Sequence, residues 1–452
     1  MNNSKKLPLI SKVGYLFGDF GSQFCWTFIG SYLSVFYTDI VGLAPVVVTT
    51  IFLIARIWDA INDPMMGAIA ERTHTKWGRF RPYMAFGAPI LAIFSTIVFV
   101  NPNFSTNGKI AFAVITYILA GMLYTMVNIP YGALAGVMTS DVEERSSLAA
   151  FRMLGMNMGM LIINAVAMPL ILHFSKSDTP VAKGYTYTAL VFAIVGCISF
   201  YITYFTSKEV VQPVQKKKVP IKDTVKTIFT PHIIKVALIQ FFVMCGFMGR
   251  VGVVVYYYMY VLKRMDKISF LMTLQSIGGI IGIVCIVKIA AKLGKKTTVV
   301  VSNILSAISM IAIFFIPASN ITLITIVTFI FGLVSGSAPL ILSMLADAID
   351  YEEYQTGIRA DGAAYATNGL ASKAGTAVAG IGVSIMAAFG YVANAEQTTG
   401  ALRGINITTN LIPAVFFILA AIIALTWKLD EKRAQQIRNE LDERIQKSNQ
   451  DT

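Results

Sequence analysis

Long apolar runs limit what this chain can fold into more than any other feature of its sequence. About twelve stretches of roughly 20 residues, each long enough to cross a lipid bilayer as a helix, alternate with short charged or glycine- and proline-rich turns. Only 13% of the residues are charged, which excludes a soluble globular domain of ordinary composition. The sequence therefore predicts an all-α membrane protein with twelve transmembrane helices.

The basic residues indicate how these helices are oriented. Lys and Arg gather at the N-terminus, in the 71–82 loop, in the 208–230 segment, in the 288–296 turn and in the C-terminal tail. Because positive residues mark cytoplasmic loops, we expect a multi-pass protein of the cell membrane with both termini in the cytoplasm. The same pattern accounts for the net charge of +13 without a nucleic-acid partner. The predicted spans are residues 13–40, 45–70, 83–101, 109–139, 146–174, 185–207, 232–262, 268–291, 297–318, 320–346, 360–391 and 403–428.

The longest basic connection falls midway along the chain and divides it into two halves. A weak internal repeat supports this division: the second and eighth spans each end in a basic glycine turn, TKWGRFRP at 75–82 and AKLGKK at 291–296. Two pseudo-symmetric six-helix bundles, with a site near the bilayer midplane, are typical of secondary transporters. The predicted parts are an N-terminal six-helix bundle at 1–207, a cytoplasmic basic linker at 208–230, a C-terminal six-helix bundle at 231–428 and a charged cytoplasmic helical tail at 429–452.

Two carboxylates lie one helical turn apart inside the second span. Asp59, Asn62 and Asp63 occupy positions i, i+3 and i+4, so their oxygen-bearing side chains project from one helix face. An unpaired acid at bilayer depth costs at least ~2.5 kcal/mol by insertion scales, and hard cations prefer oxygen ligands. This pattern predicts a site for Na⁺ or H⁺. Alternatively, Asp59 pairs with Arg56 one turn earlier, or both acids lie at the membrane interface.

Three further charges lie within apolar runs: Asp19, Arg152 and Lys373. Intramembrane charges are functional candidates by default. Lys373 could neutralise the acid pair of the second span when no cation is bound, and a cation that displaced it would favour another helix arrangement. Arg152 could instead extend its guanidinium to the cytoplasmic face.

The fourth span carries Tyr124, Thr125 and Asn128 at helical spacing before Pro130. Hydroxyls, an amide and an aromatic ring beside a helix kink suit a cavity that binds sugar, although such residues also pack helices together. The chain shows no Ser-His, Cys-His or HExxH arrangement, so the sequence predicts a protein that is not an enzyme and has no cofactor.

Four motifs together carry a family resemblance: WDAINDP at 58–64, RTHTKWGRFRP at 72–82, NIPYGAL at 128–134 and LADAIDYEEY at 345–354. They resemble the glycoside-pentoside-hexuronide:cation symporters of the major facilitator superfamily, a melibiose permease-like family. The resemblance implies uptake of a glycoside with a coupling ion, Na⁺ or H⁺, by alternating access and as a monomer. The cation site that it implies consists of Asp59, Asn62, Asp63 and Thr125. The cytoplasmic gating motif that it implies contains Glu71, Arg72, Arg79 and Arg81.

The chain departs from the melibiose branch where that branch holds its sugar. Two acids and a tryptophan of the branch are replaced here by Gln23, Asn128 and Gly132, so a glucuronide, a pentoside or a related oligosaccharide is favoured over a galactoside. A cation-dependent carrier of lysolipids on the same fold is the alternative. The substrate-binding candidates are Asp19, Gln23, Trp26, Tyr124, Asn128, Arg152, Asn368 and Lys373.

Overall fold

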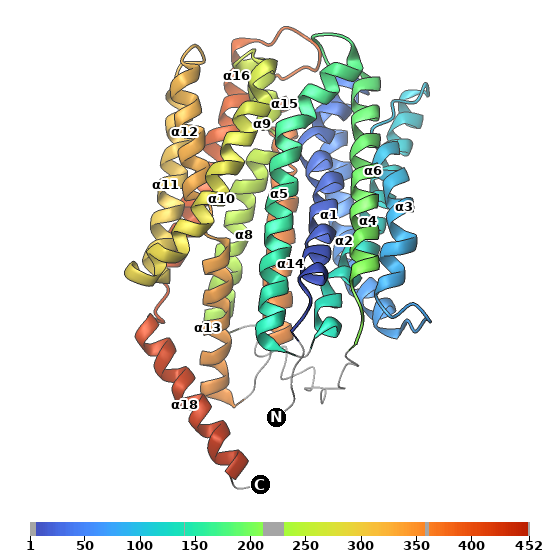
Figure 1. The fold of residues 1–452 in the computed structure, drawn as a ribbon. Coiled ribbons are helices and arrows are strands. Elements are labelled where there is room, and N and C mark those ends of the chain that lie inside the picture. Colours follow the sequence, from blue (N-terminus) through green and yellow to red (C-terminus); the bar gives the residue numbers. More distant parts are fainter. Residues whose placement is uncertain (1–5, 140, 211–229, 358–360, 451–452) are drawn as a thin grey trace. The chain divides into compact units, whose positions relative to one another are not determined.

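The computed structural model describes residues 6–139, 141–210, 230–357 and 361–450, and this part of the chain is almost entirely helical (Figure 1). In the described residues the only β-type pairing is an isolated bridge between Thr75 and Gly78. The helices up to the predicted linker are α1 (Leu9–Val35), η1 (Phe36–Ile40), α2 (Pro45–Arg72), α3 (Arg81–Ile97), α4 (Thr106–Met138), α5 (Val142–Ser175) and α6 (Ala182–Thr206).

Most of the predicted linker, residues 211–229, lies outside the described residues. The helices that follow it are α8 (Pro231–Val251), α9 (Val254–Tyr256), η2 (Tyr257–Val261), η3 (Met265–Lys267), α10 (Ile268–Leu293), α11 (Lys295–Phe315), α12 (Ile321–Val334), α13 (Ala338–Thr356), α14 (Asp361–Ala379), α15 (Gly382–Ala388), α16 (Thr399–Asn406), η4 (Ile407–Leu411), α17 (Ile412–Leu425) and α18 (Glu431–Gln450).

The described helices account for the predicted membrane spans. Ten helical segments are long and apolar enough to cross a membrane. Helix α1 and the 17-residue helix α3 fill the two remaining predicted positions. The predicted all-α architecture is therefore confirmed.

Local sequence explains where several helices begin and bend. Pro45 lies in the first turn of α2, where its missing N–H leaves no hydrogen bond unmade. Asp141 caps α5, since its carboxylate accepts hydrogen bonds from the backbone nitrogens of Glu143 at 2.8 Å and Glu144 at 3.1 Å. Pro64 lies inside α2 and removes one backbone hydrogen bond beside the predicted cation site.

The chain forms two compact units, each with its own core. Three of their boundaries coincide with helix irregularities: between α8 and α9, at Gly380 between α14 and α15, and before the π-helix η4. The first unit therefore includes segments 251–276 and 381–405, which the sequence assigns to the second bundle. The bundle boundaries given above stay a prediction. The first unit comprises Met1–Gln215, Val251–Ser276 and Ile381–Ile405, and the second comprises Lys216–Arg250, Ile277–Gly380 and Asn406–Thr452.

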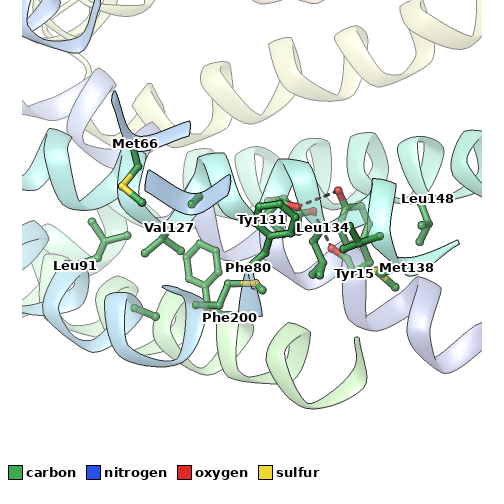
Figure 2. Close-up of a cluster of buried hydrophobic side chains, with 14 of the residues drawn as sticks. Tyr15, Met66, Phe80, Leu91, Val127, Tyr131, Leu134, Met138, Leu148 and Phe200 are labelled. Carbon is green, nitrogen blue, oxygen red and sulfur yellow. Dashed lines mark hydrogen bonds between the residues drawn. The ribbon is translucent and has the colours of Figure 1, made fainter. Parts of the chain in front are cut away.

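In the first unit, α1 packs against α5 and α6, while α4 packs against α2 and α3. Figure 2 shows the buried cluster where these helices meet. Tyr15 donates its hydroxyl to the Tyr131 carbonyl at 3.3 Å, and Tyr131 donates its own to the Tyr15 carbonyl at 2.8 Å. This reciprocal pair satisfies two buried hydroxyls and fixes α1 against α4.

In the second unit, α11 packs against α12 and α17, and α13 packs against α18. Helix α18 is the predicted charged tail, but one edge of it is buried. Ile437 is only 1% exposed, and the Arg433 guanidinium lies 5.5 Å from the centre of the Tyr354 ring on α13. The tail is thus docked on its own unit, and it is not solvated all round as its charge pattern suggests.

Glycine at position 18 permits the close approach of α1 and α4. A Cβ added at Gly18 would lie 2.1 Å from the Tyr131 ring, whereas a Cβ added at Gly30 of the same helix would have no neighbour within 4 Å. We expect Gly18→Ala to lower the free energy of unfolding by about 1–3 kcal/mol, because the Tyr15–Tyr131 pair must separate.

Thermal unfolding of the purified protein in detergent checks this expectation, with Gly30→Ala as the matched control. The control should leave the midpoint unchanged or raise it, because alanine favours a helix over glycine by about 1 kcal/mol. Equal midpoints for the two variants would show that the Figure 2 cluster does not constrain α1.

Candidate functional site

The two carboxylates of α2 have different partners in the structure. Asp59 is buried, and its Oδ2 accepts a hydrogen bond from Arg56 Nη1 at 2.9 Å. The same guanidinium donates through Nη2 to the Tyr117 hydroxyl at 3.0 Å and lies 5.0 Å from the centre of the Trp26 ring. Asp59 therefore forms the ion pair with Arg56 that the sequence offers only as an alternative.

Asp63 faces the fourth span. Its Oδ1 accepts a hydrogen bond from Thr125 Oγ1 at 2.9 Å, so α2 and α4 bring together two members of the predicted cation site. Asn62 is 4% exposed, and its Nδ2 has no hydrogen-bond partner among the described residues. Carboxylate, hydroxyl and amide groups thus meet at the α2–α4 interface, and they offer the oxygen ligands that a hard monovalent cation prefers. Among the described residues no three His, Cys, Asp or Glu side chains form a group that could hold a metal ion.

The charged pair predicted separately at Asp19 and Arg152 proves to be one unit. Arg152 Nε donates to Asp19 Oδ2 at 2.5 Å, and the guanidinium lies 5.1 Å from the centre of the Tyr131 ring. A Cβ added at Gly132 would lie 3.2 Å from Arg152 Nη1, so the small residue leaves room for the guanidinium. Arg152 therefore turns inward to α1 and not to the cytoplasmic face.

The remaining substrate candidates of the first unit lie along α1 and α4. The rings of Trp26 and Tyr124 stack with centroids 4.5 Å apart and an interplanar angle of 22°. Asn128 Nδ2 donates to Ser22 Oγ at 3.1 Å. Gln23 is half-buried, and its Oε1 accepts a hydrogen bond from Thr27 at 2.7 Å. Aromatic surface and amide groups therefore share one helix pair.

The two candidates of the second unit lie on α14. Asn368 is 6% exposed, and its Oδ1 has no hydrogen-bond partner in the described part of the chain. Lys373 is half-buried. The predicted contact between Lys373 and the α2 carboxylates joins two separate units, so it stays a prediction.

The predicted gating motif is organised around Glu209, which the sequence analysis did not select. Its carboxylate accepts hydrogen bonds from the backbone nitrogens of Arg79 at 2.8 Å, Phe80 at 2.8 Å and Arg81 at 3.0 Å. The Arg81 guanidinium donates to the Tyr204 carbonyl and lies 4.6 Å from the centre of its ring. These bonds fix the turn between α2 and α3 to the end of α6.

Glu71 and Arg72, the other two gating candidates, are exposed at the end of α2. No ion pair of either side chain is found among the described residues. The structure therefore brings Arg79 and Arg81 into the organised turn but not the two residues before it.

The corresponding turn of the second unit has the same construction. Gly294, which has a φ of +84°, precedes Lys295, and the Lys295 backbone nitrogen donates to the Glu431 carboxylate. Gly78 in the first turn has a φ of +111°. In both turns an added Cβ would come within 3 Å of the capping glutamate, at 2.6 Å from Glu209 and 2.9 Å from Glu431. The predicted internal repeat is therefore matched in the chemistry of these turns.

Two intramembrane charges were missed at sequence level. Arg250 is 1% exposed and donates to Asn410 Oδ1 at 2.5 Å within the second unit. Asp39 is 6% exposed in η1 of the first unit. Arg250 lies well inside a predicted span, so the cost rule that selected Arg152 also applies to it, whereas Asp39 lies at the end of one.

A family model described as "MFS/sugar transport protein" matches residues 14–431, which is almost the whole chain. The chain belongs to this family of the major facilitator superfamily. The predicted resemblance and the prediction that the chain is a transporter and not an enzyme are thereby confirmed.

The known relatives agree with this assignment. The chain is 34% identical to the isoprimeverose transporter of Lactiplantibacillus pentosus, over 94% of this chain and 90% of that protein. It is 31% identical to the putative glycoside/cation symporter YagG of Escherichia coli (strain K12), over 96% and 95% of the two chains. Among solved structures, it resembles that of a D-xylose-proton symporter with a TM-score of 0.63 and 14% identity, over 92% and 96% of the two chains.

The Glu209 cap provides a test of the organised turn. We expect Glu209→Gln to loosen it, because the amide that replaces one oxygen faces a backbone donor at Arg79, Phe80 or Arg81. Cleavage by trypsin after Arg79, followed by mass spectrometry, should become at least several-fold faster. Glu143→Gln, at an exposed position, is the control and should not change the cleavage rate. An unchanged rate for Glu209→Gln would show that the cap does not hold the turn.

Proposed function

We propose that this protein is a Na⁺-coupled symporter that imports a neutral, pentose-containing glycoside by alternating access. The observation that carries the proposal is the oxygen-rich α2–α4 interface, where Thr125 donates to Asp63, next to the stacked rings of Trp26 and Tyr124. The first feature suits a hard cation, and the second offers an aromatic surface to a sugar ring. The glycoside/cation symporter among the relatives supports the same function.

Arg56 links the two halves of this proposed site. It donates to Asp59 at 2.9 Å and lies 5.0 Å from the centre of the Trp26 ring. A Na⁺ ion that binds the α2 carboxylates competes with Arg56 for Asp59, because both are attracted to the same negative charge. Displacement of the guanidinium changes the contact with Trp26 and thus the surface available to the sugar. This differential contact is the form that coupling between cation and substrate requires.

The pairing of Asp19 with Arg152 bears on the substrate class. A uronic acid carboxylate needs a cation that it can approach, and the Arg152 Nε already donates to Asp19 at 2.5 Å. A neutral glycoside needs no such partner and can use the amides of Gln23 and Asn128. The isoprimeverose transporter among the relatives agrees with a neutral substrate. The hydrogen-bonding groups along α1 and α4 also suit a glycoside better than a lysolipid chain.

Transport by reconstituted protein tests the cation site. We expect Asp59→Asn and Asp63→Asn each to reduce Na⁺-driven accumulation of isoprimeverose about tenfold or more, because each loses a charge that binds the cation. Sugar exchange across vesicles without an ion gradient should persist in both variants. Asp178→Asn, at an exposed position, is the control and should transport as the unaltered protein does.

Accumulation that survives both substitutions would contradict the site assignment. Accumulation driven by a pH gradient alone, with no response to Na⁺, would identify H⁺ as the coupling ion in place of Na⁺.

A competition assay tests the substrate class. We expect an aryl xyloside to displace bound isoprimeverose at lower concentration than the matching aryl glucuronide. Asp19→Asn removes the partner of Arg152, so it should improve glucuronide binding about tenfold relative to xyloside binding. Stronger binding of the glucuronide by the unaltered protein would refute a neutral substrate. Asp178→Asn again serves as the control.

A further inference from the structure

Another buried carboxylate of the first unit, Asp39, lies in the π-helix η1 that follows α1. Asp39 is 6% exposed, and its carboxylate accepts hydrogen bonds from Thr38 at 2.6 Å, from Tyr260 at 2.5 Å and from Tyr391. Asn394 Nδ2 also donates to the Asp39 carbonyl. Three segments that are far apart in the sequence therefore meet at one acid, and all of them belong to the first unit.

The partners of Asp39 are neutral. No Lys, Arg or His in the described part of the chain forms a salt bridge with it. Hydroxyl donors solvate a carboxylate but leave its negative charge in place, and a buried charge without a counter-charge is costly. One bound positive charge would therefore compensate the negative charge of Asp39.

A cavity of about 220 Å³ lies directly beside this acid. Its polar lining comes from Asp39, Thr179, Tyr185, Tyr260 and Asn394, and its other walls are apolar. One water occupies about 30 Å³ of liquid, so the cavity holds an ion together with several waters.

Tyr185 provides a separate sign that the cavity binds something polar. Its side chain is 0% exposed and lines the cavity, yet its hydroxyl has no hydrogen-bond partner among the described residues. Buried hydroxyls are nearly always satisfied by protein or by an ordered ligand. A ligand in the cavity that accepts a hydrogen bond from this hydroxyl, or that its oxygen coordinates, would satisfy it.

We propose that this cavity is a second cation site, which binds one Na⁺ ion with part of its water shell through Asp39, Tyr185 and Tyr260. A single carboxylate balances a single positive charge, and the sites of Ca²⁺ and Mg²⁺ usually use more carboxylates or a phosphate. The oxygens of a carboxylate and of phenols are hard ligands that suit Na⁺. This site shares no residue with the α2–α4 interface and does not depend on the proposed function. A bound ion holds together the three segments that meet at Asp39.

Na⁺ titration of the purified full-length protein tests the proposal. The double variant Asp59→Asn with Asp63→Asn removes the α2 carboxylates, so a remaining response reports on another site. We expect its thermal unfolding midpoint to rise and saturate with NaCl, at constant ionic strength set by N-methyl-D-glucamine chloride. Asp39→Asn added to this background should abolish the rise.

Tyr185→Phe keeps the test decisive if the Asp39 variant fails to fold. It removes an oxygen that has no hydrogen-bond partner among the described residues, so the midpoint without Na⁺ should not fall, while the Na⁺ concentration for half-saturation should rise about fivefold or more. Tyr32→Phe is the matched control: its buried hydroxyl donates to Met272 Sδ and does not line the cavity, so the Na⁺ response should not change.

Two results would overturn the proposal. The first is a double variant with no saturable Na⁺ response, and the second is a response that Tyr185→Phe leaves unchanged. Na⁺-driven uptake by the unaltered protein distinguishes this outcome from failure of the proposed function. If that uptake persists while the double variant shows no Na⁺ response, only the second cation site is refuted. A saturable response in a protein that never couples Na⁺ to sugar refutes only the proposed symport.

Discussion

The ion pair between Asp59 and Arg56 is the interaction on which the rest of the first unit's chemistry depends. A carboxylate inside an apolar helix needs a positive partner, and here the partner comes from the preceding turn of the same helix. Because that guanidinium also contacts Trp26 and Tyr117, the charge on α2 is connected to residues of α1 and α4. A change at the acid therefore cannot remain local, and under the proposed function this connection is the route by which cation binding affects sugar binding.

Much of this architecture follows from one-dimensional features of the sequence. Apolar runs fixed the helical class, and the i, i+3, i+4 spacing placed Asp59, Asn62 and Asp63 on one face, because helix geometry alone decides that arrangement. The partner of each carboxylate did not follow from the sequence. Asp59 lies three residues from Arg56 and Asp63 lies seven residues from it, and only the packing of α4 shows that Thr125 donates to Asp63.

Glu209 and Asp39 were missed for the same physical reason. Glu209 caps a turn more than 120 residues away, as the separation of 130 positions between it and Arg79 shows, and no local pattern marks such a contact. Asp39 lies at the end of a span, where an acid usually indicates contact with water. Its burial comes from Tyr260 and Tyr391, which approach from distant segments. Contacts between distant segments therefore decide the roles of these two residues, and the periodicity of the sequence does not reveal such contacts.

The position of Glu209 has a mechanical consequence. It lies three residues after the end of α6, and its carboxylate holds the turn between α2 and α3 through three hydrogen bonds from backbone nitrogens. Movement at the end of α6 is therefore passed on to the C-terminal end of α2, the helix that carries Asp59 and Asp63.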